Sequence, residues 1–237
     1  MFKQTCQLGG LVTEISGSGR TVILLHGNGA DAREWDAVAS HLKDFRLVVP
    51  EARGHGRTPL GNAPLTIRAM ADDLAKVIAE VGRQSVIVGF SDGANLALDL
   101  ASRRTELFQG GLIVLGANLF PTGLRPFTWL GINLTYWLMR LGGCVQAKWR
   151  NRATVWSLMI NQPRIDPAAL GHLKCPSLVV TGQNDMIRQS HSRLIAQSLP
   201  GAELIIVPRQ GHFLPTQASK LVADLISQFI HWLGPVG

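Results

Sequence analysis

The hydrophobic positions of this 237-residue chain fall into short, uninterrupted runs that are separated by longer amphipathic segments. Apolarity that continues over the length of a strand, without alternating polar residues, is typical of strands buried on both faces of a parallel sheet. Runs of this kind occur at 21–25, 45–50, 85–90, 111–116, 177–181 and 203–208. A weaker strand-like pattern extends from Gln7 to Ile15.

Helical periodicity occupies the segments between these runs. Thr66 is placed to cap a helix whose apolar stripe runs over 67–81, and Gly82 is suited to end it. Asp31 and Glu34 resemble the capping box of an earlier helix. Further helices are predicted at about 94–104 and at about 189–199, and a last amphipathic helix follows His212 and runs to about Leu233. Because strands and helices alternate, we expect an α/β fold with a mostly parallel, doubly wound sheet.

The run at 85–90 passes directly into the sequence Gly-Phe-Ser-Asp-Gly and then into a helical pattern. A serine held in a sharp turn between a strand and a helix needs an unusual backbone conformation, and its neighbours on either side must lack bulk. Gly89 and Gly93 meet that need. Such a turn exposes the hydroxyl of Ser91 and leaves the amide of Asp92 at a helix N-terminus, where it could stabilise an oxyanion.

Three more strand exits carry residues suited to acyl-transfer chemistry. Asn28 follows the run at 21–25, Asp185 follows the run at 177–181, and His212 follows the run at 203–208. Ligands bind at the carboxyl ends of the strands in sheets of this kind. The order of nucleophile, acid and histidine along the chain is that of the α/β-hydrolase arrangement.

The chain resembles the α/β-hydrolase family over nearly its whole length. The resemblance lies in the segments 25–29, 51–56, 88–93, 180–185 and 210–212. It implies the α/β-hydrolase fold, with Ser91 as nucleophile, His212 as general base and acid, and Asp185 as the group that orients the imidazole. It also implies an oxyanion hole formed by the backbone amides of Asn28 and Asp92.

Several residues near these motifs have alternative roles. Asp185 could cap the helix that begins near Gln189, and the carboxylate of Asp92 could point into the cleft and favour a cationic acyl group. By the resemblance, His26 and His55 are structural. So is Glu51, which stands where the family more often has aspartate.

The segment 119–172 is a predicted helical cap or lid, inserted into a core domain made of 1–118 and 173–237. It holds four of the six tryptophans and an apolar stretch at 127–139 that is shorter than the ~20 residues of a membrane span. We expect Trp129 and Trp137 of the cap, together with Phe90, to line an apolar substrate pocket. A cap helix packed on the core and a basic, apolar cap that makes weak contact with a membrane interface remain alternatives.

Charge and cysteine content argue against several classes of partner and cofactor. The net charge is +7, and about five of the excess positive charges lie in the predicted cap. No nucleic-acid-binding motif accompanies them, so we expect no nucleic-acid partner. The three cysteines form no close pair, which argues against a disulfide framework or a zinc site, and no metal or other cofactor is predicted. The first residues have no apolar signal, which predicts a cytoplasmic protein without a transmembrane segment.

These patterns predict a serine hydrolase that cleaves a carboxylic ester, thioester or amide of a small-to-medium apolar acyl group. A C–C bond hydrolase and a cofactor-free perhydrolase would use the same residues. A ligand receptor built on a hydrolase scaffold is an alternative of another class.

Overall fold

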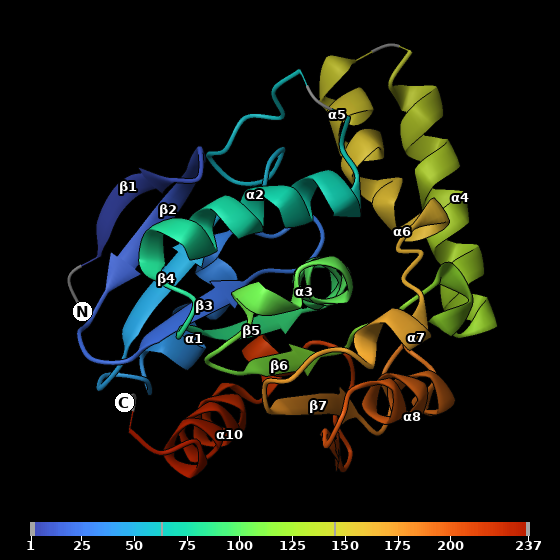
Figure 1. The fold of residues 1–237 in the computed structure, drawn as a ribbon. Helices are drawn as coiled ribbons and strands as arrows, with labels where there is room; N and C mark the ends of the chain where they lie inside the picture. The colour runs from blue at the N-terminus through green and yellow to red at the C-terminus, as the bar shows by residue number, and fades with distance from the viewer. Residues whose placement is uncertain (1–2, 63, 145, 236–237) are drawn as a thin grey trace.

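A single eight-stranded sheet forms the centre of the computed structural model, which describes residues 3–62, 64–144 and 146–235 (Figure 1). The strands of this described part are Gln4–Leu8 (β1), Leu11–Ser16 (β2), Thr21–Leu25 (β3), Arg46–Pro50 (β4), Val86–Phe90 (β5), Leu112–Leu115 (β6), Ser177–Gly182 (β7) and Glu203–Val207 (β8). Their order is β1-β2-β4-β3-β5-β6-β7-β8. The β1–β2 and β2–β4 pairs are antiparallel and the remaining pairs are parallel. The predicted mostly parallel sheet is confirmed.

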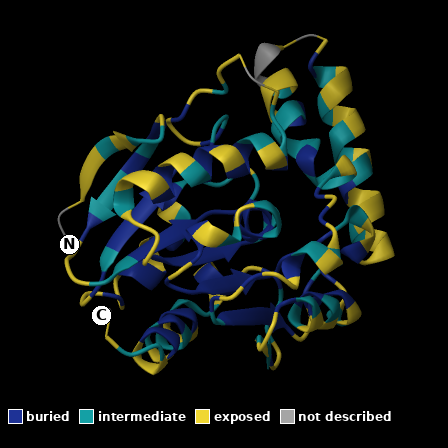
Figure 2. Cartoon of the chain, viewed as in Figure 1, coloured by how far each residue is buried: buried dark blue, intermediate teal, exposed yellow. Residues whose placement is uncertain are grey.

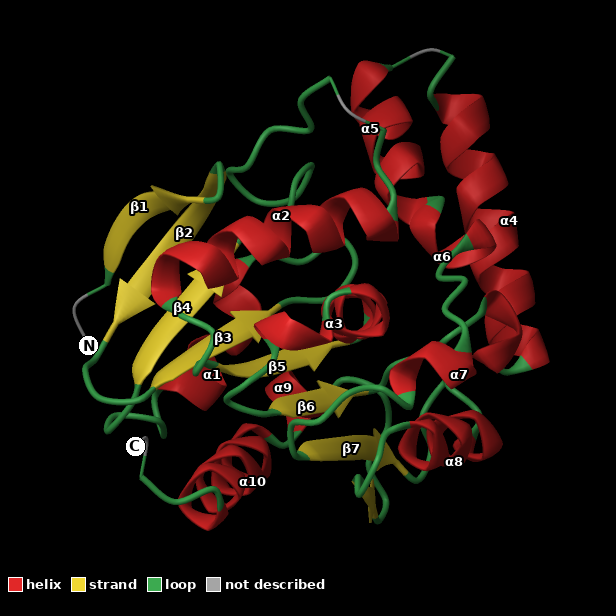
Figure 3. Cartoon of the chain, in the orientation of Figure 1, coloured by secondary structure: helices red, strands yellow, loops and turns green. Residues whose placement is uncertain are grey.

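Helices cover both faces of this sheet (Figure 3). The α-helices of the described residues are Asp36–Ala39 (α1), Ile67–Val81 (α2), Asp92–Arg103 (α3), Pro126–Gly142 (α4), Ala147–Trp156 (α5), Leu158–Asn161 (α6), Pro167–Leu170 (α7), Gln189–Ser198 (α8), Leu214–Gln217 (α9) and Ser219–Trp232 (α10). Short 3-10 helices span Ala32–Trp35, Thr105–Leu107 and Pro121–Gly123. Thr66 caps α2 as predicted, because its side chain accepts a hydrogen bond from the amide of Ala69.

The uninterrupted apolar runs are explained by two cores, one on each side of the sheet. In β3, Ile23 and Leu25 pack toward α2, α3 and α8, whereas Val22 and Leu24 pack toward α1 and α10. Successive side chains of a strand point to opposite faces, so a strand covered on both sides needs an apolar residue at every position. Figure 2 shows the central strands as buried along their length.

The first crossover differs from the expected helix. Asp31 does cap it, since its side chain accepts from the amide of Arg33, but a 3-10 turn leads into a single turn of α1. The capping-box interpretation of Glu34 is wrong. Its half-buried carboxylate accepts instead from the amide of Gly27, at 2.7 Å, and thereby supports the loop that follows β3.

Helices α4, α5 and α6 pack on one another at one side of the sheet (Figure 1). The indole nitrogen of Trp156 in α5 donates to the carbonyl of Ile132 in α4, at 3.1 Å. Ile132 also packs with Leu124 and Ile187 beneath α4. Helix α7 instead adds Leu170 to the core that contains α3. The division of the chain into a core domain and a cap at 119–172 stays a prediction. None of the helices described is long and apolar enough to cross a membrane.

Candidate active site

Ser91 lies at the turn between β5 and α3, with its side chain accessible at the carboxyl end of a central strand. Its backbone has φ 52° and ψ −119°, a left-handed conformation that is rare for a residue with a side chain. The turn also requires small neighbours: a Cβ atom on Gly89 would lie 2.5 Å from the Cα atom of Ala94, and one on Gly93 would meet the backbone of Leu25. The structure therefore has the strained strand-to-helix turn that the sequence predicts.

His212 and Asp185 approach Ser91 from two other strand exits. The Nε2 atom of His212 lies 3.1 Å from the Oγ atom of Ser91, and its Nδ1 atom lies 2.8 Å from an Oδ atom of Asp185. All three side chains are thus joined in one hydrogen-bonded chain. The ring of His212 is buried, with the ring of Phe90 against it at a centroid distance of 5.0 Å and that of Phe213 at 5.5 Å.

Asp185 is completely buried, and its surroundings favour the ionised carboxylate. Burial by itself would raise the pKa of Asp185. The hydrogen bonds from His212, from the amide of Ile187 and from the hydroxyl of Thr181 outweigh that effect and keep the pKa below its ordinary value. Arg188 occupies the N-cap position of α8, so the Asp185 carboxylate faces the histidine rather than capping this helix.

Gly116, directly after β6, leaves the space in which the His212 ring lies. Its φ is +59°, and a Cβ atom there would lie 2.8 Å from the Cε1 atom of His212 and 2.9 Å from its Nδ1 atom. In the sequence, this glycine marks only the end of a predicted strand. No signal in a single sequence identifies it as a neighbour of the histidine.

Asn28 and Asp92 contact each other beside the nucleophile. The Nδ2 atom of Asn28 donates to a carboxylate oxygen of Asp92 at 2.8 Å and to the carbonyl of Val155 in α5 at 2.9 Å. The backbone amide of Asp92 belongs to the first turn of α3, where N–H groups have no acceptor within the helix. The two residues implied for an oxyanion hole are therefore neighbours, and their role as donors stays a prediction.

The carboxylate of Asp92 is committed to protein partners. Its second oxygen accepts from the side-chain amide of Asn95, at 3.1 Å. Burial raises the pKa of Asp92 above its ordinary value, against the lowering effect of the hydrogen bond from Asn28. Both oxygens have amide partners, so the structure does not support the alternative in which this carboxylate selects a cationic acyl group.

Asn95 and Asn118 extend this network to the beginning of the 119–172 segment. Asn95 donates to Asn118 at 3.0 Å and accepts from its backbone amide at 2.9 Å, and the Asn118 side chain donates to the carbonyl of Phe120. Together with the contact between Asn28 and Val155, a chain of amide groups joins the nucleophile turn to two points of the predicted cap. The sequence does not predict this network, because asparagines have no spacing that identifies their partners.

A cavity of about 390 Å³ adjoins Asn28. Its walls are the loop around His55 and the cap residues Met139, Arg152, Val155 and Trp156. It lies between the loops that follow β3 and β4 and the helices α4 and α5. Met139, Val155 and Trp156 form its apolar lining, and Asn28, His55, Asn151 and Arg152 its polar lining. Ser91 and His212 do not line this cavity, which reaches the nucleophile turn only through Asn28.

The three residues expected to line a substrate pocket lie elsewhere. Trp129 and Trp137 are 43% and 57% exposed on α4, and neither side chain lines the cavity beside Asn28. Phe90 is buried beneath the turn that contains Ser91 and packs against His212. The structure therefore does not bring these aromatic side chains together around a pocket.

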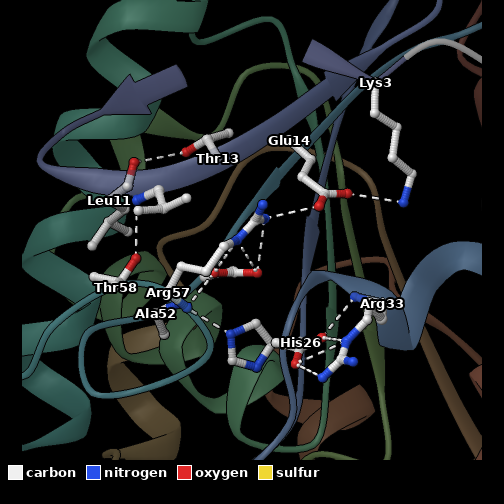
Figure 4. Close-up of polar contacts among 12 residues, drawn as sticks. Lys3, Leu11, Thr13, Glu14, His26, Arg33, Ala52, Arg57 and Thr58 are labelled. Atoms are coloured by element: carbon white, nitrogen blue, oxygen red, sulfur yellow. Dashed lines mark hydrogen bonds and ion pairs between the residues drawn. The ribbon is translucent and has the colours of Figure 1, made fainter. Parts of the chain in front are cut away.

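The loop after β4 is held by polar contacts that involve the residues implied to be structural (Figure 4). The Nε2 atom of His26 accepts from the amide of Ala52 at 3.0 Å, and burial, aided by the nearby His55, lowers the pKa of His26 to about 4. Arg57 pairs with Glu14 at 2.8 Å and with the buried Glu51 at 3.0 Å. These contacts fix the loop that forms one wall of the cavity.

Nothing in the described part of the chain resembles a metal site, since no three His, Cys, Asp or Glu side chains converge there. Cys6, Cys144 and Cys175 are free thiols.

The chain is similar to known hydrolases in sequence. The sequence profile of the alpha/beta hydrolase family matches residues 22–225. The putative carbamate hydrolase RutD of Caulobacter sp. is 26% identical over a gapped alignment of 262 positions, which covers 96% of this chain and 98% of that protein. The uncharacterized hydrolase YraK of Bacillus subtilis is 34% identical over 97 residues, which cover 39% of this chain and 36% of that protein.

Two solved structures illustrate the similarity of fold. A thermophilic esterase from Thermogutta terrifontis, determined with malate bound, has a TM-score of 0.78 at 22% identity, covering 98% of this chain and 100% of that chain. A meta-cleavage product hydrolase from Pseudomonas fluorescens IP01 has a TM-score of 0.75 at 21% identity, covering 97% of each chain. At these identities the similarity establishes the fold.

Proposed function

We propose that this chain, a hydrolase that belongs to the alpha/beta hydrolase family, cleaves carboxylic esters of small-to-medium apolar acyl groups through an acyl-enzyme on Ser91. One observation carries the proposal. The side chains of Ser91, His212 and Asp185 form a single hydrogen-bonded chain, with distances of 3.1 and 2.8 Å. A nucleophile next to a base that is itself oriented by a third group is the arrangement that activates a hydroxyl.

In the proposed reaction, His212 takes the proton of Ser91 as the hydroxyl oxygen attacks the ester carbonyl. The negative charge that develops on the carbonyl oxygen is stabilised by the backbone amides of Asn28 and Asp92. His212 then donates its proton to the departing alcohol, leaving the acyl group on the serine. Water, deprotonated by the same histidine, releases the acid. The ionised Asp185 favours each imidazolium stage, since a buried negative charge lies directly beside the ring.

The cavity supports the choice of substrate class. Its volume of about 390 Å³ lies within the usual range for small-molecule sites, and Met139, Val155 and Trp156 give it an apolar wall. Thioesters and amides would use the same groups. The C–C hydrolase and perhydrolase alternatives remain enzymatic variants of this site that substrate profiling separates.

The test is hydrolysis of p-nitrophenyl esters of increasing chain length, together with labelling by a fluorophosphonate. Ser91→Ala should lower kcat/KM by about 10⁴-fold or more and abolish labelling, because the nucleophile and the proton transfer are lost together. Ser190→Ala, an exposed serine in α8, is the matched control and should behave as the unchanged protein. Undiminished ester hydrolysis by Ser91→Ala would refute the proposal. Turnover of vinylogous diketones but not of aryl esters would favour the C–C hydrolase.

A further inference from the structure

Helix α4 carries an apolar surface that the rest of the described chain leaves uncovered. Of the ten large apolar side chains that are exposed in the described part, seven lie between residues 127 and 141. We call six of them the outer α4 face, with exposed fractions between 57% and 90%: Phe127, Leu130, Leu134, Trp137, Leu138 and Leu141. The other four are Trp129, which lies off this face of α4, Phe213 just before α9, and Leu221 and Trp232 in α10.

The spacing of these six residues makes them one continuous stripe. They follow one another at intervals of three or four residues, with Leu138 next to Trp137, so an α-helix aligns them on one side. Ile132 is the buried residue of α4 and lies on the opposite side. Figure 2 shows α4 at the outer edge of the molecule with exposed residues along its length. The stripe therefore faces away from the protein.

Positive charge accompanies this stripe. Arg125 immediately precedes α4, and the Arg140 guanidinium lies 5.7 Å from the centre of the Trp137 ring, at the border of the outer α4 face. Residues 119–165 contain six Lys or Arg and no Asp or Glu. An apolar stripe bordered by arginines and an aromatic ring is suited to the boundary between lipid headgroups and acyl chains.

We propose that the outer α4 face docks on the surface of an anionic lipid bilayer. The six apolar side chains enter the headgroup boundary, while Arg125 and Arg140 remain at the level of the phosphates and pair with them. Charge favours this occupant over a second copy of the chain. A two-fold contact through α4 would bring the arginines of both copies together in a protein whose net charge is already +7.

The test is co-sedimentation with vesicles of phosphatidylcholine alone or with phosphatidylglycerol added. The unchanged protein should bind the anionic vesicles, and raising the salt concentration should weaken binding by screening the arginines. The double variant Leu134→Gln, Leu138→Gln should bind about tenfold or more weakly, because two apolar groups no longer enter the boundary. Arg140→Gln should bind about fivefold more weakly to anionic vesicles, and less so at high salt.

Matched controls separate docking from general loss of apolar surface. Leu221→Gln with Trp232→Gln changes two exposed residues of α10, and Arg68→Gln changes an exposed arginine of α2, so both should bind as the unchanged protein does. Circular dichroism and thermal unfolding verify that every variant is folded. Failure of the unchanged protein to bind anionic vesicles would overturn the proposal, as would equal losses in the α4 and α10 double variants. A dimer in solution that the α4 double variant dissociates, without vesicle binding, would assign the face to a second copy instead.

Discussion

Gly116→Ala is the substitution that most directly tests whether the position of the His212 ring controls turnover. The added methyl group would lie 2.8 Å from the Cε1 atom of His212 and 2.9 Å from Nδ1, and 3.4 Å from an Oδ atom of Asp185. The hydrogen bond from the Gly116 amide to the carbonyl of Val180 does not depend on the side chain. The substitution therefore adds one carbon atom beside the ring and removes no polar contact.

The expected magnitude follows from two terms. An alanine at φ +59° costs about 1 kcal/mol of free energy of unfolding, because its Cβ atom is strained in the left-handed region. Ordinary carbon contacts are about 3.5 Å or more, so the ring must move by about 0.7 Å or more. The rings of Phe90 and Phe213 limit where it can go. Since misplacement by about 1 Å can cost about 10²-fold in rate, we expect kcat/KM to fall about 100-fold.

Gly201→Ala supplies the matched control. Its φ is +67°, and a Cβ atom there meets open space. Gly201→Ala should therefore lose about 1 kcal/mol of unfolding free energy in urea from backbone strain alone, and Gly116→Ala should lose about 1–3 kcal/mol more, because its methyl group also overpacks the buried ring. Only Gly116→Ala should show the lower kcat/KM in hydrolysis of p-nitrophenyl butyrate. If the two variants hydrolyse this ester equally well, the position of the His212 ring does not limit the reaction, and the proposed role of this histidine is refuted.

Asn28→Ala removes the side-chain donor that joins Asp92 to the Val155 carbonyl, so kcat should fall about tenfold or more with a smaller change in KM. The free energy of unfolding in urea should fall by about 2 kcal/mol. A change in KM alone, measured by stopped-flow ester hydrolysis, would contradict this positioning role. His191 accepts a hydrogen bond from the Leu119 amide at 2.8 Å, and burial lowers the pKa of His191 to about 4. The folded protein therefore binds fewer protons than the unfolded chain below pH 6.5, and this contribution to stability is lost as the pH falls from about 6.5 to about 4. When the pH is lowered from 7 to 4.5, the free energy of unfolding of His191→Gln should fall by about 2 kcal/mol less than that of the unchanged protein. Equal decreases for the two proteins in urea unfolding would argue against the burial of a neutral imidazole.

The regular part of the fold was accessible from the sequence because each element encodes it locally. The uninterrupted apolar runs at β3, β5 and β7 identify strands covered on both faces, and the glycines around Ser91 identify the sharp turn. Of the predicted capping box at Asp31 and Glu34, only the part played by Asp31 was correct. Asp31 caps its helix through a contact two residues away, whereas Glu34 binds the amide of Gly27 in a loop that precedes it.

In the predicted cap, the sequence did not reveal which side chains face the protein. Its aromatic residues suggested a pocket, yet Trp129 and Trp137 lie on an exposed side of α4, and Met139 and Trp156 line the cavity instead. Periodicity shows that a helix has two faces, but a helix that is apolar on both sides does not show which one packs on the protein.

By itself, the sequence determined the mostly parallel α/β sheet and the positions of Ser91, Asp185 and His212 at the ends of strands, because strand burial, turn geometry and chain order are properties of short segments. Only the tertiary structure decided the 3.1 and 2.8 Å contacts among these side chains, the space that Gly116 leaves for the imidazole, and the outward direction of the apolar stripe on α4. These features join residues far apart in the chain, so they depend on how the packed elements meet and leave no mark on local sequence patterns.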